Sequence, residues 1–164
     1  MEPAPIPYNE KGRIKAVEEL GILDTEPEER FDKLTKEAIE KLKMPISTIS
    51  IIDSNREWYK SCQGIKDKEG ERKVSFCGHA IFATNMFVVE DTLKDIRFFN
   101  NPTVIGYPFI RFYAGVTLLD KRTRFPVGVF CVKDTKPRKL SLEETAIIMD
   151  IAERAEKEIN TPKK

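Results

Sequence analysis

The sequence predicts an α+β fold, with a central, mostly antiparallel sheet of five or six strands and helices on both faces. Two helical segments come first and strand-like segments then follow one another, so helices and strands do not alternate as they do in parallel βαβ proteins. Two late apolar strands are joined by a polar turn, which is typical of an antiparallel hairpin. With 164 residues the chain fits one domain and can bury roughly two-thirds of the surface that its unfolded form exposes.

The N-terminal part of the chain predicts an extended arm and two helices. Residues 1–8 are rich in proline, which cannot hold a helix interior, so they are expected to be extended. A first helix is expected over about residues 9–20, with Gly21 as its stop. Thr25 and Glu28 have the spacing of a capping box, which predicts the start of a second helix.

The middle of the chain predicts strands and one long connection. Residues 46–53 are apolar and β-branched at both odd and even positions, as in a strand covered on both faces. Residues 57–62 fit the returning strand of a hairpin. A short helix around residues 79–83 and a brief strand over 87–90 follow. Residues 91–110 then form a long segment rich in Asp, Asn and Pro, and connections of this length usually carry function.

The C-terminal part predicts a hairpin and a last helix. The hairpin strands are expected over residues 111–119 and 127–134. Ser141 and Glu144 have capping-box spacing, and the helix that they open has an apolar stripe. One side of this helix can pack on the sheet while part of another remains for a partner. We expect residues 161–164 to be a disordered tail. The stripe consists of Ile148, Ala152, Ala155 and Ile159.

Composition and charge exclude several functions. The chain has 28 basic and 27 acidic residues, so no global field favours nucleic acid or an anionic membrane. Three cysteines, none in a Cys-x-x-Cys spacing, indicate thiols in a reducing compartment. The N-terminus lacks the basic start and apolar core of a secretory signal, and no apolar run reaches membrane-spanning length. We therefore expect a cytoplasmic protein with no nucleic-acid or membrane partner.

Several short motifs, in a fixed order, resemble those of GAF domains. Residues 21–32 begin Gly-Ile-Leu-Asp-Thr and end Glu-Arg-Phe-Asp, which resembles the helix that precedes the core in the bacterial-type sensory group. Residues 75–81 read Ser-Phe-Cys-Gly-His-Ala-Ile, and residues 128–134 read Gly-Val-Phe-Cys-Val-Lys-Asp. The resemblance covers nearly all of residues 9–158 and implies a single GAF domain over residues 9–160. It also implies a pocket roofed by a lid segment.

The resemblance implies a non-catalytic sensory module that binds a small molecule. Such domains signal through their terminal helices, by forming a homodimer or by docking to an output protein such as a kinase, cyclase or phosphodiesterase. Ile14 and Val17, together with the apolar stripe of the last helix, are the residues expected at that interface. Nothing follows the last helix in the sequence, so we expect either a separated output domain or signalling by docking.

The candidate ligand-binding residues lie in the lid segment, the long connection and the hairpin. We expect neither catalytic residues nor metal ligands, because Cys-x-His alone supplies too few ligands for zinc. Packing is the favoured role of the cysteines, and hydrogen bonding within the lid is favoured for the histidine. The polar loop residues fit ligand contacts and local turns equally well. The candidates are Phe76, Cys77, His79, Asp91, Arg97, Phe98, Asn101, Phe112, Tyr113 and Cys131.

Three alternatives to this interpretation stay open. Some proteins of this fold are thiol-dependent reductases of free methionine sulfoxide, which need a second cysteine within about 7 Å, Cα to Cα. Haem or bilin binding is disfavoured, because Gly78 separates Cys77 from His79 whereas bilin-carrying relatives have these residues adjacent. A nucleotide ligand remains open, and the ligand itself is unknown. The last alternative is a ligand-free dimerisation module.

Overall fold

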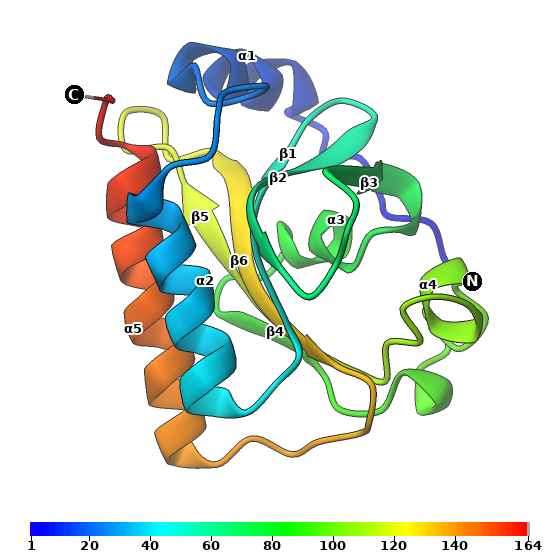
Figure 1. The fold of residues 1–164 in the computed structure, drawn as a ribbon. Coiled ribbons are helices and arrows are strands. Elements are labelled where there is room, and N and C mark those ends of the chain that lie inside the picture. The colour runs from blue at the N-terminus through cyan, green and yellow to red at the C-terminus, as the bar shows by residue number, and fades with distance from the viewer. Residues whose placement is uncertain (164) are drawn as a thin grey trace.

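The computed structural model describes residues 1–163 and has the predicted α+β architecture (Figure 1). A six-stranded sheet has the order β3-β2-β1-β6-β5-β4, and every pair of neighbouring strands is antiparallel. The central position of β1 explains why it is apolar at both odd and even positions, since all of its residues are buried. The strands are β1 (Ile46–Ile52), β2 (Arg56–Gln63), β3 (Glu69–Glu71), β4 (Met86–Val89), β5 (Phe112–Leu119) and β6 (Pro126–Asp134).

Helices cover both faces of the sheet. The long helices α2 and α5 lie side by side on one face, and the short helices α3 and α4 lie on the other (Figure 1). None of the helices in residues 1–163 is both long and apolar enough to cross a membrane. The α-helices are α1 (Glu10–Leu20), α2 (Glu29–Leu42), α3 (Phe76–Ala80), α4 (Pro102–Ile105) and α5 (Leu142–Ile159), and two 3-10 helices are η1 (Arg72–Val74) and η2 (Thr92–Lys94).

Helix ends follow local sequence signals in some places and not in others. Gly21 ends α1 in the left-handed conformation, and Ser141 with Glu144 forms the predicted capping box of α5. The capping box predicted for α2 is wrong, because the hydroxyl of Thr25 donates to the carbonyl oxygen of Ile22 at 2.5 Å and α2 begins four residues later, at Glu29. The short helix around His79 begins earlier than predicted, because the side chain of Ser75 accepts from the amide of Gly78.

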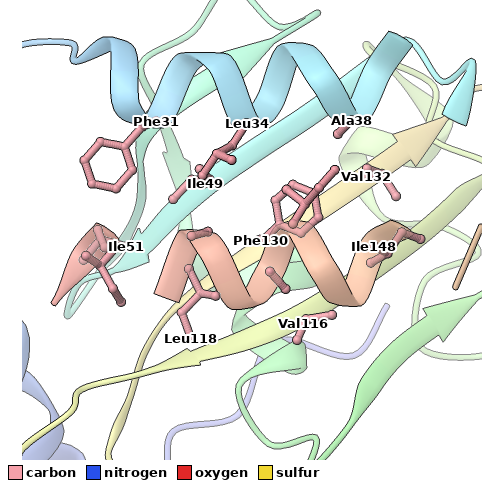
Figure 2. Close-up of a cluster of buried hydrophobic side chains, with 14 of the residues drawn as sticks. Phe31, Leu34, Ala38, Ile49, Ile51, Val116, Leu118, Phe130, Val132 and Ile148 are labelled. Atoms are coloured by element: carbon pink, nitrogen blue, oxygen red, sulfur yellow. The ribbon is translucent and has the colours of Figure 1, made fainter. Parts of the chain in front are cut away.

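The main hydrophobic core lies between the sheet and the pair α2 and α5. Figure 2 shows apolar side chains from both helices facing those from three strands. Each of these large side chains stabilises the fold by about 1.5–3 kcal/mol through burial. This face of the molecule is therefore filled by its own side chains. Labelled members are Phe31, Leu34, Ala38, Ile49, Ile51, Val116, Leu118, Phe130, Val132 and Ile148.

The apolar stripe of α5 belongs to this core, which corrects the expectation that it forms a surface for a partner. Ile148, Ala152, Ala155 and Ile159 are all buried within the chain, and so is Val17 of α1. Ile14 is half-buried. Dimerisation itself stays a prediction, but these residues cannot provide its interface without leaving the core.

The N-terminal arm and the long connection both lie against the opposite face. The arm is extended, and its amides at Glu2 and Ala4 donate to the carbonyls of Arg97 and Lys73 at 3.0 and 2.9 Å. The predicted long connection contains η2 and α4. At the other end of the chain, Thr161 accepts a hydrogen bond from the guanidinium of Arg30, while residue 164 of the predicted tail lies outside the described residues.

Candidate functional site

The sheet face that carries α3 and α4 is polar in its middle, unlike the face under α2 and α5. Side chains alternate between the two faces along each strand. The register places Ser50 of β1 beside Tyr59 of β2, and Ile52 beside Glu57, so that these residues share the α3 side. On β6, Cys131 is a member of the second hydrophobic cluster under α3, and Lys133 shares its parity. Polar and ionisable groups therefore gather beneath α3 and α4.

A cavity of about 130 Å³ lies among these groups, between β2, β3 and β6 and the segment from η1 to α4. Its lining includes two buried charged residues, Glu57 and Lys133, and apolar or aromatic walls that include Tyr59, Phe76 and Ile110. Three exposed acidic residues also line it: Asp67, Glu69 and Glu71. A larger groove of about 800 Å³ runs between the α1–α2 connection and the end of α5, but it is lined mainly by exposed, charged side chains. The smaller cavity is the better candidate, because it combines apolar walls with a few converging polar groups.

Lys133 is the most unusual residue of the cavity. Its side chain is 4 % exposed, yet its ammonium takes part in none of the ion pairs or side-chain hydrogen bonds found among residues 1–163. The ring of Tyr113 lies with its centroid 5.9 Å from Nζ. Burial disfavours the ammonium, but the attraction of Cys131 and Glu57 outweighs this effect and raises the pKa of Lys133 above its usual value. The lysine is therefore charged at neutral pH.

Glu57 and Tyr59 supply two further polar groups. Glu57 is 2 % exposed, and its Oε2 accepts from the hydroxyl of Ser50 at 2.7 Å, while no partner of Oε1 is found among residues 1–163. The phenol of Tyr59 is also without a hydrogen bond in the described chain, and burial followed by the charge of Glu57 raises its pKa. Each of these groups lines the cavity and has capacity for a ligand.

The two buried thiols lie beneath the cavity rather than on its surface. Cys77 Sγ lies 3.1 Å from the hydroxyl of Tyr113, and Cys131 Sγ lies 3.1 Å from the hydroxyl of Thr48. Both cysteines are fully buried, and neither is among the lining residues. Burial raises the pKa of Cys77. Burial acts in the same direction on Cys131, but hydrogen bonding with Cys77 and the charge of Lys133 outweigh it and lower its pKa.

Of the predicted aromatic candidates, three gather in one stack and one does not. The ring of Phe76 stacks on Phe98 and Tyr113, with centroids 4.3 and 5.1 Å apart. Phe76 also lines the cavity. Phe112 belongs to the core under α2 and α5, because it precedes Tyr113 in β5 and so points to the opposite face. Phe112 therefore does not line this cavity, and its role as a ligand contact stays a prediction.

The polar candidates of the lid and the long connection hold local structure. Asp91 caps η2 and Asn101 caps α4. The guanidinium of Arg97 donates two hydrogen bonds to the carboxylate of Asp95. The Nε2 atom of His79 lies 3.1 Å from the carbonyl oxygen of Glu2, and burial lowers the pKa of its imidazole. None of these four residues lines the 130 Å³ cavity.

Sequence reasoning missed the two buried charged residues of the cavity, Glu57 and Lys133. One signal was present: Lys133 shares the parity of Cys131 within an apolar strand, where a charged residue is unusual. Glu57 gives no such signal, because a strand after a turn commonly carries charge. Among residues 1–163, no group of three or more His, Cys, Asp or Glu side chains is arranged to hold a metal ion.

Comparison with known sequences identifies the family. The family model of the GAF domain matches residues 26–159, so the chain belongs to the GAF domain family. A cyclic di-GMP phosphodiesterase of Pseudomonas aeruginosa is 37% identical over 138 residues, which is 84% of this chain and 23% of that protein. The chain thus spans about a quarter of this relative's length.

Solved structures share the fold at low sequence identity. The GAF domain of a phosphoenolpyruvate-protein phosphotransferase from Coxiella burnetii superposes with a TM-score of 0.66 and 12% identity, covering 91% of this chain and 93% of its own. A free methionine-R-sulfoxide reductase of Neisseria meningitidis, in complex with its substrate, has a TM-score of 0.63 and 14% identity, covering 98% of both chains. These similarities establish the common fold, which regulatory domains and an enzyme share.

Proposed function

We propose that the chain is a non-catalytic regulatory domain that binds a small molecule in the 130 Å³ cavity and passes its state to a signalling output. Membership of the GAF family and the 37% identity to part of a cyclic di-GMP phosphodiesterase support a regulatory role. An output of the phosphodiesterase class is part of the proposal, because the relative contains a region similar to this chain and is about four times as long. A cytoplasmic location remains part of it too.

The observation that carries the proposal is the buried and unpaired charge in the cavity. A buried ionised group is costly unless a counter-ion or hydrogen bonds compensate it. Lys133 forms no ion pair or side-chain hydrogen bond among residues 1–163, so Cys131 and Glu57 attract its ammonium only from a distance, and it lines a space that a ligand can enter. A ligand-free dimerisation module would have no need of this arrangement, so the observation favours a binding function.

A route from the cavity to α1 supports a signalling role. Glu71 and Val74 line the cavity on either side of Arg72. The guanidinium of Arg72 donates to Glu10 of α1 at 2.5 Å, and Glu10 also pairs with the buried Arg13. A ligand that binds one arrangement of the η1 segment better than another would thereby shift the position of α1.

A second candidate, a thiol-dependent reductase, has one observation in its favour. Cys77 and Cys131 lie close enough to influence each other's pKa. Catalysis would require one of these thiols to meet the substrate, and both are fully buried outside the cavity lining. We therefore prefer the non-catalytic function.

Native mass spectrometry of protein purified without denaturation tests the proposal. We expect a bound small-molecule mass in the natural protein and its loss in Val74→Trp, in which a larger side chain fills the cavity that Val74 lines. Val88→Trp is the matched control, because Val88 is 37 % exposed on β4, away from the cavity. Equal bound mass in both variants would place the ligand elsewhere, and the subunit count in the same spectra tests the predicted dimer.

A further inference from the structure

Two buried lysines of this chain differ in a way that points to the chemistry of the missing partner. Lys60 is 3 % exposed, and its ammonium contacts the hydroxyl of Thr25 at 2.8 Å, the carbonyl of Glu26 at 2.6 Å and the carboxylate of Glu28 at 2.8 Å. Lys133 is equally buried and has none of these contacts in the described chain. The fold thus satisfies Lys60 fully with its own oxygen atoms, although Thr25, Glu26 and Glu28 also line the large, exposed groove. The difference assigns the partner of Lys133 to a molecule in the cavity.

We propose that this molecule is a small zwitterion of the size of a free amino acid, with its anionic group on Lys133 and its protonated amine on Glu57. The inference rests on the proposed function, since it names the ligand class of the same cavity.

The two charged residues reach the cavity from strands on either side of β1. Lys133 pairs with Ile46, the first residue of β1, and Glu57 pairs with Ile52, its last residue. Their charged atoms are more than 4.0 Å apart, since no ion pair joins them. A single small anion would pair Lys133 and leave Oε1 of Glu57 unpaired. A ligand that carries both charges compensates both residues at once, as buried charges require.

Much of the remaining lining is apolar or aromatic, and Asp67, Glu69 and Glu71 add exposed carboxylates to it. Tyr59 and Phe76 supply rings, while Ile65, Val74 and Ile110 supply aliphatic surface. These surfaces suit the hydrocarbon part of a ligand, and the phenol of Tyr59 can donate one further hydrogen bond. The cavity therefore offers what an amino-acid-sized molecule presents: two opposite charges and a short carbon skeleton.

Size separates this ligand class from nucleotides. A volume of 130 Å³ is below the range of about 300–1,000 Å³ that is usual for larger ligands. A mononucleotide or dinucleotide would fit only if the segments around β3 and α4 moved apart. A small zwitterion fits the cavity as it stands.

A thermal-shift screen of the intact protein tests the inference. The probes are the free proteinogenic α-amino acids, each compared with its N-acetyl form, which lacks the ammonium, and its carboxamide, which lacks the carboxylate. We expect at least one free amino acid to raise Tm, because a ligand of the native state stabilises it. Both derivatives are expected to bind at least about tenfold more weakly, since each leaves one buried charge unpaired.

Two substitutions locate the binding. Lys133→Met removes the partner of the anionic group, and Glu57→Gln removes the charge that holds the amine but keeps an acceptor for Ser50. Each should weaken binding of the active amino acid at least about tenfold in calorimetric titration. Lys136→Met is the matched control, because Lys136 is exposed on the loop after β6, and it should bind as the natural protein does.

The outcomes separate this inference from the proposed function. If a cyclic mononucleotide or cyclic di-GMP raises Tm and no amino acid does, the zwitterion is wrong and the binding function stands. If an amino acid binds but its N-acetyl and amide forms bind equally well, or if both variants keep full affinity, the assigned contacts are wrong. If no probe binds and native spectra contain no bound mass, both proposals fall.

Discussion

The two faces of the sheet solve the problem of burial in different ways. Under α2 and α5, apolar side chains fill the space, and the buried Lys60 at the edge of that face is held by three oxygen partners. Under α3 and α4, a polar centre surrounds a cavity, and Lys133 has no partner of this kind in residues 1–163. The same residue type thus has direct partners on one face and none within the described chain on the other. Under the proposed function, stability and binding would be separated across one sheet.

The comparison of the two lysines gives the largest expected effect on stability. Lys60→Met should lower the free energy of unfolding by roughly 2–3 kcal/mol, because three oxygen atoms lose a buried donor. Lys133→Met should lower it by about 1 kcal/mol or less, because it breaks no ion pair or hydrogen bond within residues 1–163 and removes only the longer-range attraction of Cys131 and Glu57. Urea unfolding followed by circular dichroism measures both values.

The same experiment can contradict the comparison. An equal decrease in the free energy of unfolding of Lys60→Met and Lys133→Met would mean that Lys133 has a stabilising partner in the free protein, such as a bridging water network to Glu57. Lys136→Met serves as the surface control, and its free energy of unfolding should stay within about 0.5 kcal/mol of the natural value.

The cysteines sharpen the comparison further. Burial raises the pKa of Cys62 to about 11, and Cys77 and Cys131 are fully buried. At pH 8 the thiolate fraction of Cys62 is therefore expected to be roughly a hundredfold below that of an ordinary cysteine. Reaction of the native protein with a thiol-specific disulfide reagent should be slower by about that factor than reaction of the urea-unfolded protein.

Mass spectrometry of the early products identifies which cysteine reacts. A rapid reaction at Cys131, whose pKa is lowered, would show that its thiol is reachable and would favour the reductase function over the regulatory one. Consumption of free methionine sulfoxide by the protein would likewise favour the reductase function over the regulatory one. Slow reaction at all three positions agrees with a cavity whose thiols serve packing.

Much of the fold could be predicted because its signals are local. The all-apolar pattern of β1 and the capping box of α5 involve residues within one element, and the structure contains both. The start of α2 could not be predicted in this way. Thr25 has the right spacing for a cap, but its hydroxyl donates to Ile22 and accepts from Lys60, which lies far along the chain.

The site was predicted in part for the same reason. Phe76, Cys77, Tyr113 and Cys131 lie together because short motifs already placed them on the lid and the hairpin. The pairing of Glu57 with Lys133 across the cavity depends on the register of β2 and β6 against β1, which no single segment encodes. Strand alternation alone does exclude Phe112 once Tyr113 is assigned to the cavity side, since adjacent residues point to opposite faces.

The smallest expected effect concerns the lid of the polar face. Burial lowers the pKa of His79, so the folded protein binds fewer protons at this residue than the unfolded chain does. The contribution of the neutral imidazole is therefore present above the unfolded pKa of about 6.5 and is lost as the pH falls through the lowered folded value.

His79→Gln keeps a hydrogen-bond donor toward the carbonyl of Glu2 but does not titrate. The difference in unfolding free energy between the natural protein and this variant should then shift against the natural protein between pH 8 and pH 5, as read from urea midpoints at several pH values. Hydrogen bonding from Arg97 lowers the pKa of the neighbouring Asp95, so this carboxylate stays ionised between pH 5 and pH 8 in both proteins. A difference that is constant with pH would mean that the imidazole reaches solvent and that the N-terminal arm does not cover it.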